Sequence, residues 1–185
     1  MHVAAGGGPS VQRLILHSCA PSTKQYPDTR AEALLGPVVF SPLLQGAVWG
    51  LVRSVVRSDA GLRMMLSQLS NLPTSQWWDQ MSVADKDEAQ SLFRAMRSDS
   101  GFTNDLRQAH PRGADARRKA MSAVKCPTMV TASRSDGGVS FTHAEDFARV
   151  IPDAELVELS SPSHLFWIGS QKTQLMSTLH SFIQE

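Results

Sequence analysis

The sequence predicts an α/β fold in which a parallel sheet is interrupted by a helical insertion. Three short apolar runs, at residues 13–17, 128–132 and 156–159, have the length and composition of buried parallel strands. A helical pattern separates the second run from the third, which predicts a strand–helix–strand unit. Residues 27–103, between the first run and the second, carry helical patterns alone.

The composition is that of a globular domain. The chain has 185 residues, of which 42% are hydrophobic and 19% charged, and its formal net charge is +1. This charge favours neither nucleic acid nor a membrane surface as a partner, and no apolar run reaches the ~18 residues of a membrane helix. The start lacks the regions of a secretion signal, and Cys19 and Cys126 are expected to be reduced core thiols. We therefore expect a cytoplasmic protein.

The first predicted strand, residues 13–17, contains a Leu-Ile-Leu run and ends at a polar sequence. His17 at its end is interpreted as a structural residue. Ser18 and Ser22 follow the strand, at the edge where parallel sheets carry their sites. They are candidate polar lining groups and weaker candidates for a substitute nucleophile.

Amphipathic helices are predicted after this strand. The stretch 46–57 is expected to bury one face, and Asp59 is expected to cap the next helix. Ser82 and Asp85 have the spacing of a capping box. The basic residues of 104–121, which include Arg117, alternate with aspartates and are predicted to form a solvated helix face. The buried face of 46–57 would consist of Val48, Leu51, Val52 and Val55.

The strand–helix–strand unit presents one carboxylate and one imidazole. Strand 128–132 leads into a turn that carries Asp136, and strand 156–159 leads into a turn that carries His164. Loops at the carboxyl ends of parallel strands hold the chemistry of such sheets. His143 is expected in the first turn of the helix between them, in a capping or surface role. The helical face is marked by Ala144, Phe147, Ala148 and Ile151.

These two turns carry a family resemblance. Residues 133–140, S-R-S-D-G-G-V-S, resemble the acid turn of α/β-hydrolases, usually G-R-x-D-x-x-V-P. Residues 161–168, S-P-S-H-L-F-W-I, resemble the histidine turn of the same family, usually G-x-G-H. The chain departs from the pattern at Ser133, where the family usually has glycine, and at Ser161 and Ser163, which flank the histidine.

The resemblance implies a truncated α/β-hydrolase-like parallel sheet with an inserted helical lid. The lid would be residues 27–103, and the core would be residues 1–26 and 104–185. Asp136 matches the acid of the catalytic triad and His164 its base. The implied activity is carboxylesterase-like hydrolysis of small or aromatic esters, or of related acyl or carbon–carbon bonds, with a small hydrophobic ester-like substrate.

Large apolar side chains are expected to line the substrate pocket, because such sites are mainly apolar. The alternative is that they fill the core of the lid itself. No cofactor is expected, and no metal site, because neither H-x-x-x-H nor C-x-x-C spacing occurs. The candidate substrate-binding residues are Trp49, Trp77, Trp78 and Phe166.

The nucleophile is not identified. The family places its serine in a G-x-S-x-G turn, whereas residues 3–9 have small residues without a serine. This stretch is a remnant of that turn, a start-site artefact, or a place where Ser10 acts instead. A catalytically inactive binding or assembly module is therefore the alternative function. With three predicted strands, an apolar sheet edge stays open, which predicts a homodimer joined through that edge.

Overall fold

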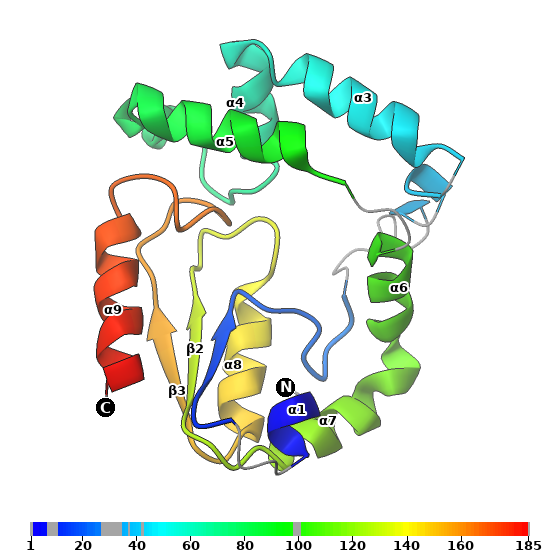
Figure 1. Cartoon of the computed structure of the whole chain (residues 1–185), viewed down its shortest axis with the longest axis vertical. Coiled ribbons are helices and arrows are strands. Elements are labelled where there is room, and N and C mark those ends of the chain that lie inside the picture. Colours follow the sequence, from blue (N-terminus) through cyan, green and yellow to red (C-terminus); the bar gives the residue numbers. More distant parts are fainter. Residues whose placement is uncertain are drawn as a thin grey trace.

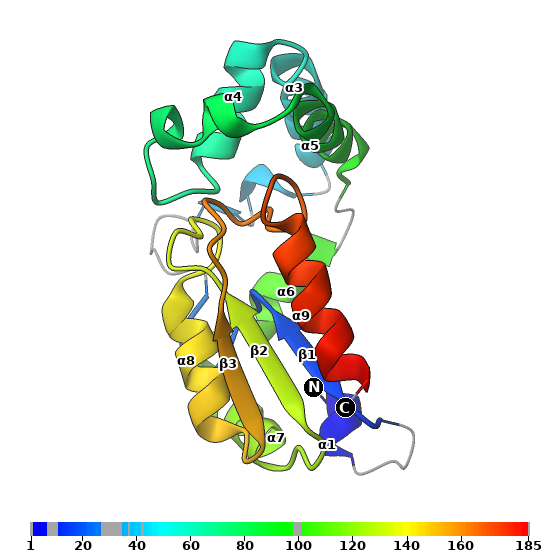
Figure 2. The same cartoon turned by 90° about the vertical axis from the view of Figure 1, so that its left-hand side faces the viewer.

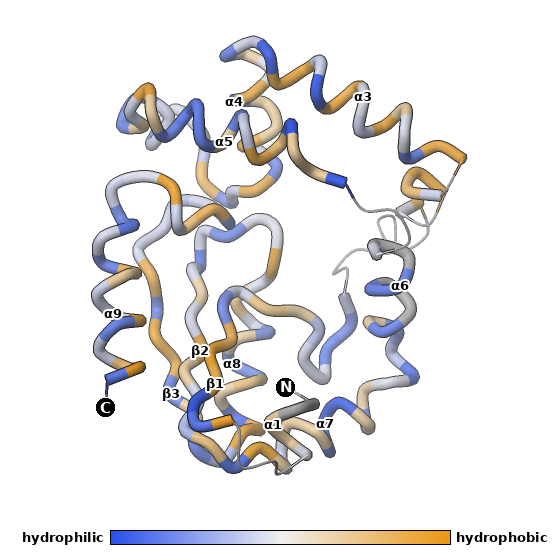
Figure 3. The backbone as a smooth tube through the Cα atoms, viewed as in Figure 1, coloured by the Kyte–Doolittle hydropathy of each residue, from blue (hydrophilic) through white to orange (hydrophobic). Residues whose placement is uncertain are grey.

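The computed structural model contains a small parallel sheet, helices on both of its faces and a group of helices above one end (Figures 1 and 2). In Figure 3 apolar residues run along the strands of the sheet and recur along the first long helix of the upper group. The structure describes residues 2–6, 11–26, 35–36, 38–41, 43–97 and 101–184.

The sheet has three parallel strands in the order β1-β2-β3 among the described residues. The strands are β1 (Leu14–His17), β2 (Thr128–Ala132) and β3 (Ala154–Glu158). All five residues of β2 are buried, as expected for the central strand of a parallel sheet that is covered on both faces. The strand–helix–strand prediction is therefore confirmed, with β3 beginning two residues earlier than the sequence predicts.

Two helices cover the two faces of the sheet (Figure 2). Helix α8 (Phe141–Val150) connects β2 to β3 and buries Ala144 and Phe147 against one face. Helix α9 (Lys172–Gln184) lies on the other face, where Leu175 packs with Leu159 and Phe166. Two further helices, α1 (His2–Ala5) and α7 (Ala114–Ser122), lie beside the α8 face at the lower end of the sheet (Figure 1).

The upper helices occupy the end of the sheet where the strands finish (Figure 1). Their own core contains Leu62, Leu66, Phe93 and two tryptophans, and it extends to Leu165 and Ile168 of the histidine turn. The elements are α3 (Gln45–Val55), α4 (Asp59–Ser67), the 3₁₀ turns η1 (Thr74–Gln76) and η2 (Trp78–Gln80), and α5 (Val83–Ala95). The chain returns to the sheet through α6 (Gly101–Gln108), η3 (Pro111–Gly113) and α7.

The structure confirms the predicted cap of α5 and corrects the predicted cap of α4 and the predicted burial of α3. The Ser82–Asp85 capping box is present at the start of α5. At α4, however, the cap is Ser58, whose hydroxyl accepts from the Gly61 amide, and Asp59 is the first helical residue. Helix α3 contains no buried residue, and Leu51 is 66% exposed. The predicted helix is present, but its apolar face is only partly covered, because Val52 packs against the core of the upper helices whereas Leu51 faces solvent.

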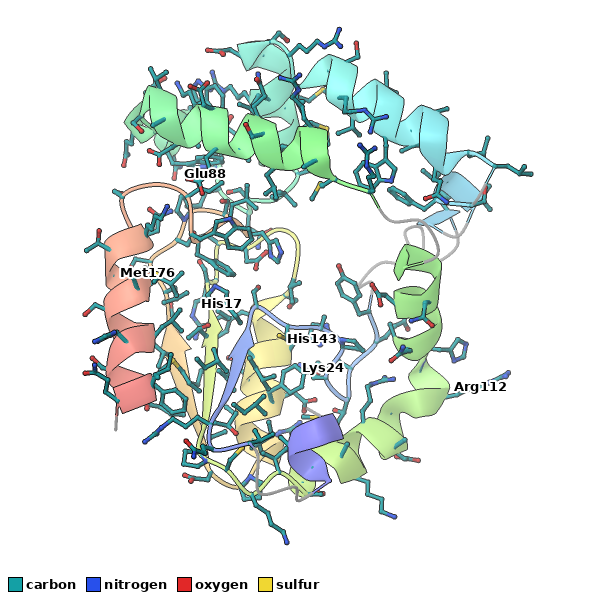
Figure 4. All side chains as sticks on the ribbon, in the orientation of Figure 1. His17, Lys24, Glu88, Arg112, His143 and Met176 are labelled. Carbon is teal, nitrogen blue, oxygen red and sulfur yellow. The ribbon has the colours of Figure 1, made fainter. Side chains whose placement is uncertain are left out.

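Arg117, predicted on a solvated helix face, and His143, predicted in a capping or surface role, are both buried beneath the turn after β1. Arg117 is 7% exposed, and its guanidinium donates to the carbonyls of Ser22, Gln108 and His110. His143 is fully buried beside Ser22, with 3.0 Å between Nδ1 and the serine oxygen (Figure 4). Both corrections have one cause, because the turn after β1 folds back over α7 and α8 and excludes water from them.

Candidate active site

The acid turn begins directly after β2 and holds its aspartate in a fixed orientation. The Asp136 amide donates to the Ser133 carbonyl over 3.2 Å, which closes the turn. One carboxylate oxygen, Oδ1, accepts from the amides of Gly138 at 2.7 Å and Val139 at 2.9 Å. Asp136 is only 2% exposed, so these backbone donors replace water around this oxygen.

The second carboxylate oxygen faces the histidine turn, which follows β3. His164 Nδ1 lies 2.9 Å from Asp136 Oδ2. The aspartate side chain is fully buried, whereas 29% of the imidazole is exposed. Because an ionised carboxylate only accepts, Nδ1 carries the proton and Nε2 of a neutral ring is left as a base. No side chain or amide of the described residues forms a hydrogen bond with Nε2.

Ser18 supplies a further donor to the same carboxylate. Its hydroxyl hydrogen-bonds Asp136 Oδ2, and its amide donates to the Thr131 carbonyl over 2.8 Å. The backbone of Ser18 is left-handed, with φ of 41°, a conformation that L-residues adopt at an energetic cost. Ser18 lies at the strand end, as predicted, but its bond to Asp136 is not predictable from the sequence, because no local signal marks a bond across 118 residues.

The electrostatics keep the aspartate ionised. Burial acts to raise the pKa of Asp136, but the hydrogen bonds from His164 and Ser18 outweigh it and hold the pKa below its ordinary value. An ionised Asp136 fixes the tautomer of His164 and stabilises the imidazolium form. The pair therefore has the arrangement of an acid and a base in nucleophilic catalysis.

His17 lies near this pair, because its ring and the ring of His164 both contact Phe166. Its Nδ1 hydrogen-bonds the Thr131 hydroxyl, and its ring meets Phe166 edge-on with 4.3 Å between centroids. Burial, and then the nearby His164, lower the pKa of His17, while Asp136 opposes the shift. A lowered pKa leaves His17 uncharged at neutral pH, so it forms part of the wall of the site without adding a charge.

Gly138 lies against the imidazole ring. A Cβ at this position would be 3.1 Å from His164 Cγ and 3.3 Å from its Nδ1. These separations are shorter than ordinary van der Waals contact, so a side chain here would push the ring away from Asp136. The second glycine of the Asp-Gly-Gly sequence thus leaves the ring its full space beside Asp136.

The four predicted substrate-binding aromatics are not gathered in one place. Phe166 is 1% exposed and lies 5.7 Å from the His164 ring, centroid to centroid. Trp77 lines a small hollow of about 30 Å³ between α4 and the histidine turn. Trp78 is buried in the core of the upper helices, and Trp49 packs on Phe40 at 5.5 Å. Trp167, which was not among the predicted site residues, has its ring 6.4 Å from that of His164, centroid to centroid.

Metal ligands and membrane-crossing helices are two further features of the described residues that bear on function. Within the described part of the chain, no three His, Cys, Asp or Glu side chains are grouped so that they could hold a metal ion. Among the helices of the same residues, none combines the length and the apolar character that crossing a membrane requires.

Among known proteins, the chain is similar in sequence to an uncharacterized hydrolase of Bacillus subtilis, YcgS. The two are 30% identical over 200 residues, which cover all of this chain and 68% of the relative. No protein-family model matches the chain.

Solved structures resemble the fold at low identity. An enol-lactonase from Burkholderia xenovorans superposes with a TM-score of 0.59 at 17% identity, over 99% of this chain and 60% of that protein. An esterase from Thermogutta terrifontis has a TM-score of 0.59 at 17% identity, over 94% of this chain and 56% of that protein. MenH from S. aureus has a TM-score of 0.54 at 20% identity, over 98% of this chain and 62% of that protein.

The chain thus spans between 56% and 62% of the length of these solved proteins. It carries an α/β fold like theirs, and the relative that covers it fully is a hydrolase by name. The parallel sheet, the relative and the similar structures lead to the same assignment: the chain belongs to the α/β-hydrolase superfamily.

Proposed function

We propose that this protein takes part in carboxylesterase-like hydrolysis of small or aromatic esters, or of related acyl or carbon–carbon bonds, with Asp136 as acid and His164 as base. One observation carries the proposal. His164 Nδ1 is held 2.9 Å from a buried carboxylate, while the partly exposed ring keeps Nε2 free of other partners among the described residues. Two of the similar proteins, an enol-lactonase and an esterase, are named for ester-type bonds.

The chemistry of the pair follows from its protonation. Nε2 of His164 accepts the proton of an attacking hydroxyl as the oxygen bonds to the ester carbonyl. The imidazolium that forms is stabilised by Asp136 and returns the proton to the leaving alcohol. A second round with water as the attacking group releases the acid and restores the enzyme.

The attacking hydroxyl is a separate question. Ser18 donates to Asp136, and Ser22 is fully buried beside His143, so neither hydroxyl is bonded to His164. Ser10 lies outside the described residues. A fluorophosphonate probe followed by peptide mapping would identify the residue that attacks.

The direct test is hydrolysis of p-nitrophenyl acetate by the full chain and by His164→Ala and Asp136→Asn. Loss of the base is expected to lower kcat at least about 100-fold. His180→Ala is the matched control, because His180 is an exposed histidine on α9, away from the pair. Equal turnover in the wild type and in His164→Ala would refute the proposed role.

A second candidate is a catalytically inactive module that serves binding or assembly. It is favoured by the absence of a hydroxyl or thiol bonded to His164 Nε2 in the part of the chain that the structure describes. The two functions differ in one outcome. If the chain neither reacts with the fluorophosphonate nor hydrolyses the ester, the inactive module is the better account.

A further inference from the structure

A short piece of the upper helical group, Leu69–Asn71, lies between the acid turn and the histidine turn. It follows α4, and in Figures 1 and 2 the connection after α4 descends toward the end of the sheet. Ser70 forms an isolated antiparallel β-bridge with Asp136. We call Leu69–Asn71 the bridging segment.

The bridging segment bonds both turns at once. The Leu69 carbonyl accepts from the amide of Gly137 at 3.1 Å and from the amide of His164 at 2.8 Å. The Leu69 carbonyl oxygen therefore links the acid turn, at Gly137, to the histidine turn, at His164. The Ser70 hydroxyl adds a bond to the Pro162 carbonyl in the histidine turn, at 2.5 Å.

Asn71 secures the acid turn from the other side. Its amide donates to the Ser135 carbonyl at 2.8 Å, and its side-chain nitrogen donates to the Asp136 carbonyl at 2.7 Å and the Arg134 carbonyl at 3.3 Å. The Asn71 side chain thus replaces water at carbonyls of the turn whose orientation sets the carboxylate. Asn71 is exposed, so its side chain does not belong to a packed core.

The first glycine of the Asp-Gly-Gly sequence is shaped to the bridging segment. A Cβ on Gly137 would lie 2.6 Å from the Ser70 amide nitrogen and 2.9 Å from the Leu69 carbonyl carbon. Real Cβ atoms do not approach backbone this closely, so glycine is needed where the two backbones touch. Gly137 accommodates the bridging segment and Gly138 accommodates the imidazole, which accounts for the pair of glycines after the acid.

We propose that the bridging segment is a positioning element for Asp136 and His164, with Asn71 as its positioning residue. It couples the helical group to the pair, because any movement that withdraws Leu69 releases the His164 amide and the Gly137 amide together. The part of the helical group around α4 and η1 also packs on the histidine turn, through contacts of Leu66 and Trp77 with Leu165. It is therefore part of the scaffold of the site, and does not lift away from it as a free cover.

The positioning role is tested first without turnover. In the full chain, Asn71→Ala and Asn71→Asp are compared with Asn104→Ala, an exposed asparagine on α6 remote from both turns. Amide hydrogen exchange at Gly137 and His164 is expected to quicken about fivefold in Asn71→Ala. Asn71→Asp should quicken it further, because a carboxylate then faces two carbonyl oxygens. Asn104→Ala should leave both rates unchanged.

The His164 ring gives the readout that a purely structural role would not move. The resonance of the His164 Nδ1 proton, followed by NMR, should move upfield in both Asn71 variants, because a loosened Asp136 accepts that proton in a weaker hydrogen bond. Where the wild type hydrolyses ester, kcat should fall in these variants with KM retained. Unchanged exchange at Gly137 and His164, with an unchanged Nδ1 proton resonance in both variants, would overturn the proposal. If the wild type hydrolyses nothing, the proposed function fails, while exchange and the proton resonance still decide the positioning role.

Discussion

Two effects of opposite sign on stability meet at Ser18, and two substitutions can separate them. The left-handed backbone lowers stability, and the hydrogen bond from the hydroxyl to Asp136 raises it. Ser18→Ala removes the hydroxyl and keeps the strained backbone, with φ of 41° in the native chain. Ser18→Gly removes the hydroxyl and relieves the strain, because glycine adopts positive φ freely. Both variants therefore lose the hydrogen bond to Asp136, but only Ser18→Gly relieves the backbone strain.

The magnitudes follow from these two terms. A hydrogen bond to a charged group contributes about 1.5–3 kcal/mol, so Ser18→Ala should lower the free energy of unfolding by about 2 kcal/mol. Relief of left-handed strain is worth about 1–2 kcal/mol, while the added freedom of glycine in the unfolded chain costs about 0.5–1 kcal/mol. Ser18→Gly should therefore be destabilised by only about 1 kcal/mol, despite losing the same bond.

The effect of Ser18→Ala should also depend on pH. The pKa of Asp136 in the folded chain lies below its ordinary value of 3.8. Its contribution to stability is therefore complete above pH 3.8 and is lost as the pH falls through the folded-state pKa. Removing a donor raises that pKa, so the stability difference between wild type and Ser18→Ala should be largest near pH 7 and shrink in acid.

Urea unfolding followed by tryptophan fluorescence at pH 7 and pH 3 measures all of these quantities. Ser140→Ala, which removes the hydroxyl that caps α8 and does not touch Asp136, is the control for pH dependence, since its cost should be equal at both pH values. Two results would refute the reasoning. One is equal stability of Ser18→Ala and wild type at pH 7, and the other is a Ser18→Gly variant less stable than Ser18→Ala.

Three more perturbations test other parts of the structure. Gly138→Ala should push the His164 ring from Asp136 and lower ester hydrolysis at least about tenfold, with far-ultraviolet circular dichroism unchanged; full activity would contradict the contact. Asp146, buried and bonded to Thr23 and Arg149, has a pKa held below its usual range because hydrogen bonds, chiefly from Thr23, outweigh burial. Asp146→Asn should therefore cost about 2 kcal/mol at pH 7 and less at pH 2, measured by urea unfolding; a cost independent of pH would count against it. The outer edge of β1 has no neighbouring strand in the described residues, so light scattering should give the mass of two chains, and the mass of one chain would exclude dimerisation through that edge.

Much of the core, and the proximity of Asp136 and His164, could be predicted because both depend on the hydropathy pattern of nearby residues. Thr128–Ala132 is an apolar run of strand length, and the turns after β2 and β3 meet because parallel strands end at the same edge of the sheet. Knowing that edge was enough to predict that Asp136 and His164 lie close together. The capping box of α5 was likewise readable, because both of its members lie within one helical turn.

Other features depend on contacts between distant parts of the chain. The same amphipathic pattern predicts a buried face for α3 and for α4, yet α3 has no buried residue and α4 buries Leu62 and Leu66. The charge of Arg117 likewise predicted a solvent-exposed side chain, and this prediction was wrong. The guanidinium is buried beneath the turn at Ser22 and donates to three backbone carbonyls. Hydropathy indicates which side chains favour burial, but a side chain is buried only where the fold brings another element against it.

The sequence by itself therefore determined the order of the strands and helices, the family and the two turns that carry the acid and the base. Only the tertiary structure decided what holds them: Ser18 on the carboxylate, Leu69 across both turns, and a glycine for each close approach. The reason is physical. Strand and helix signals come from residues a few positions apart, whereas these contacts join groups 26 to 118 positions apart, whose meeting depends on the whole fold.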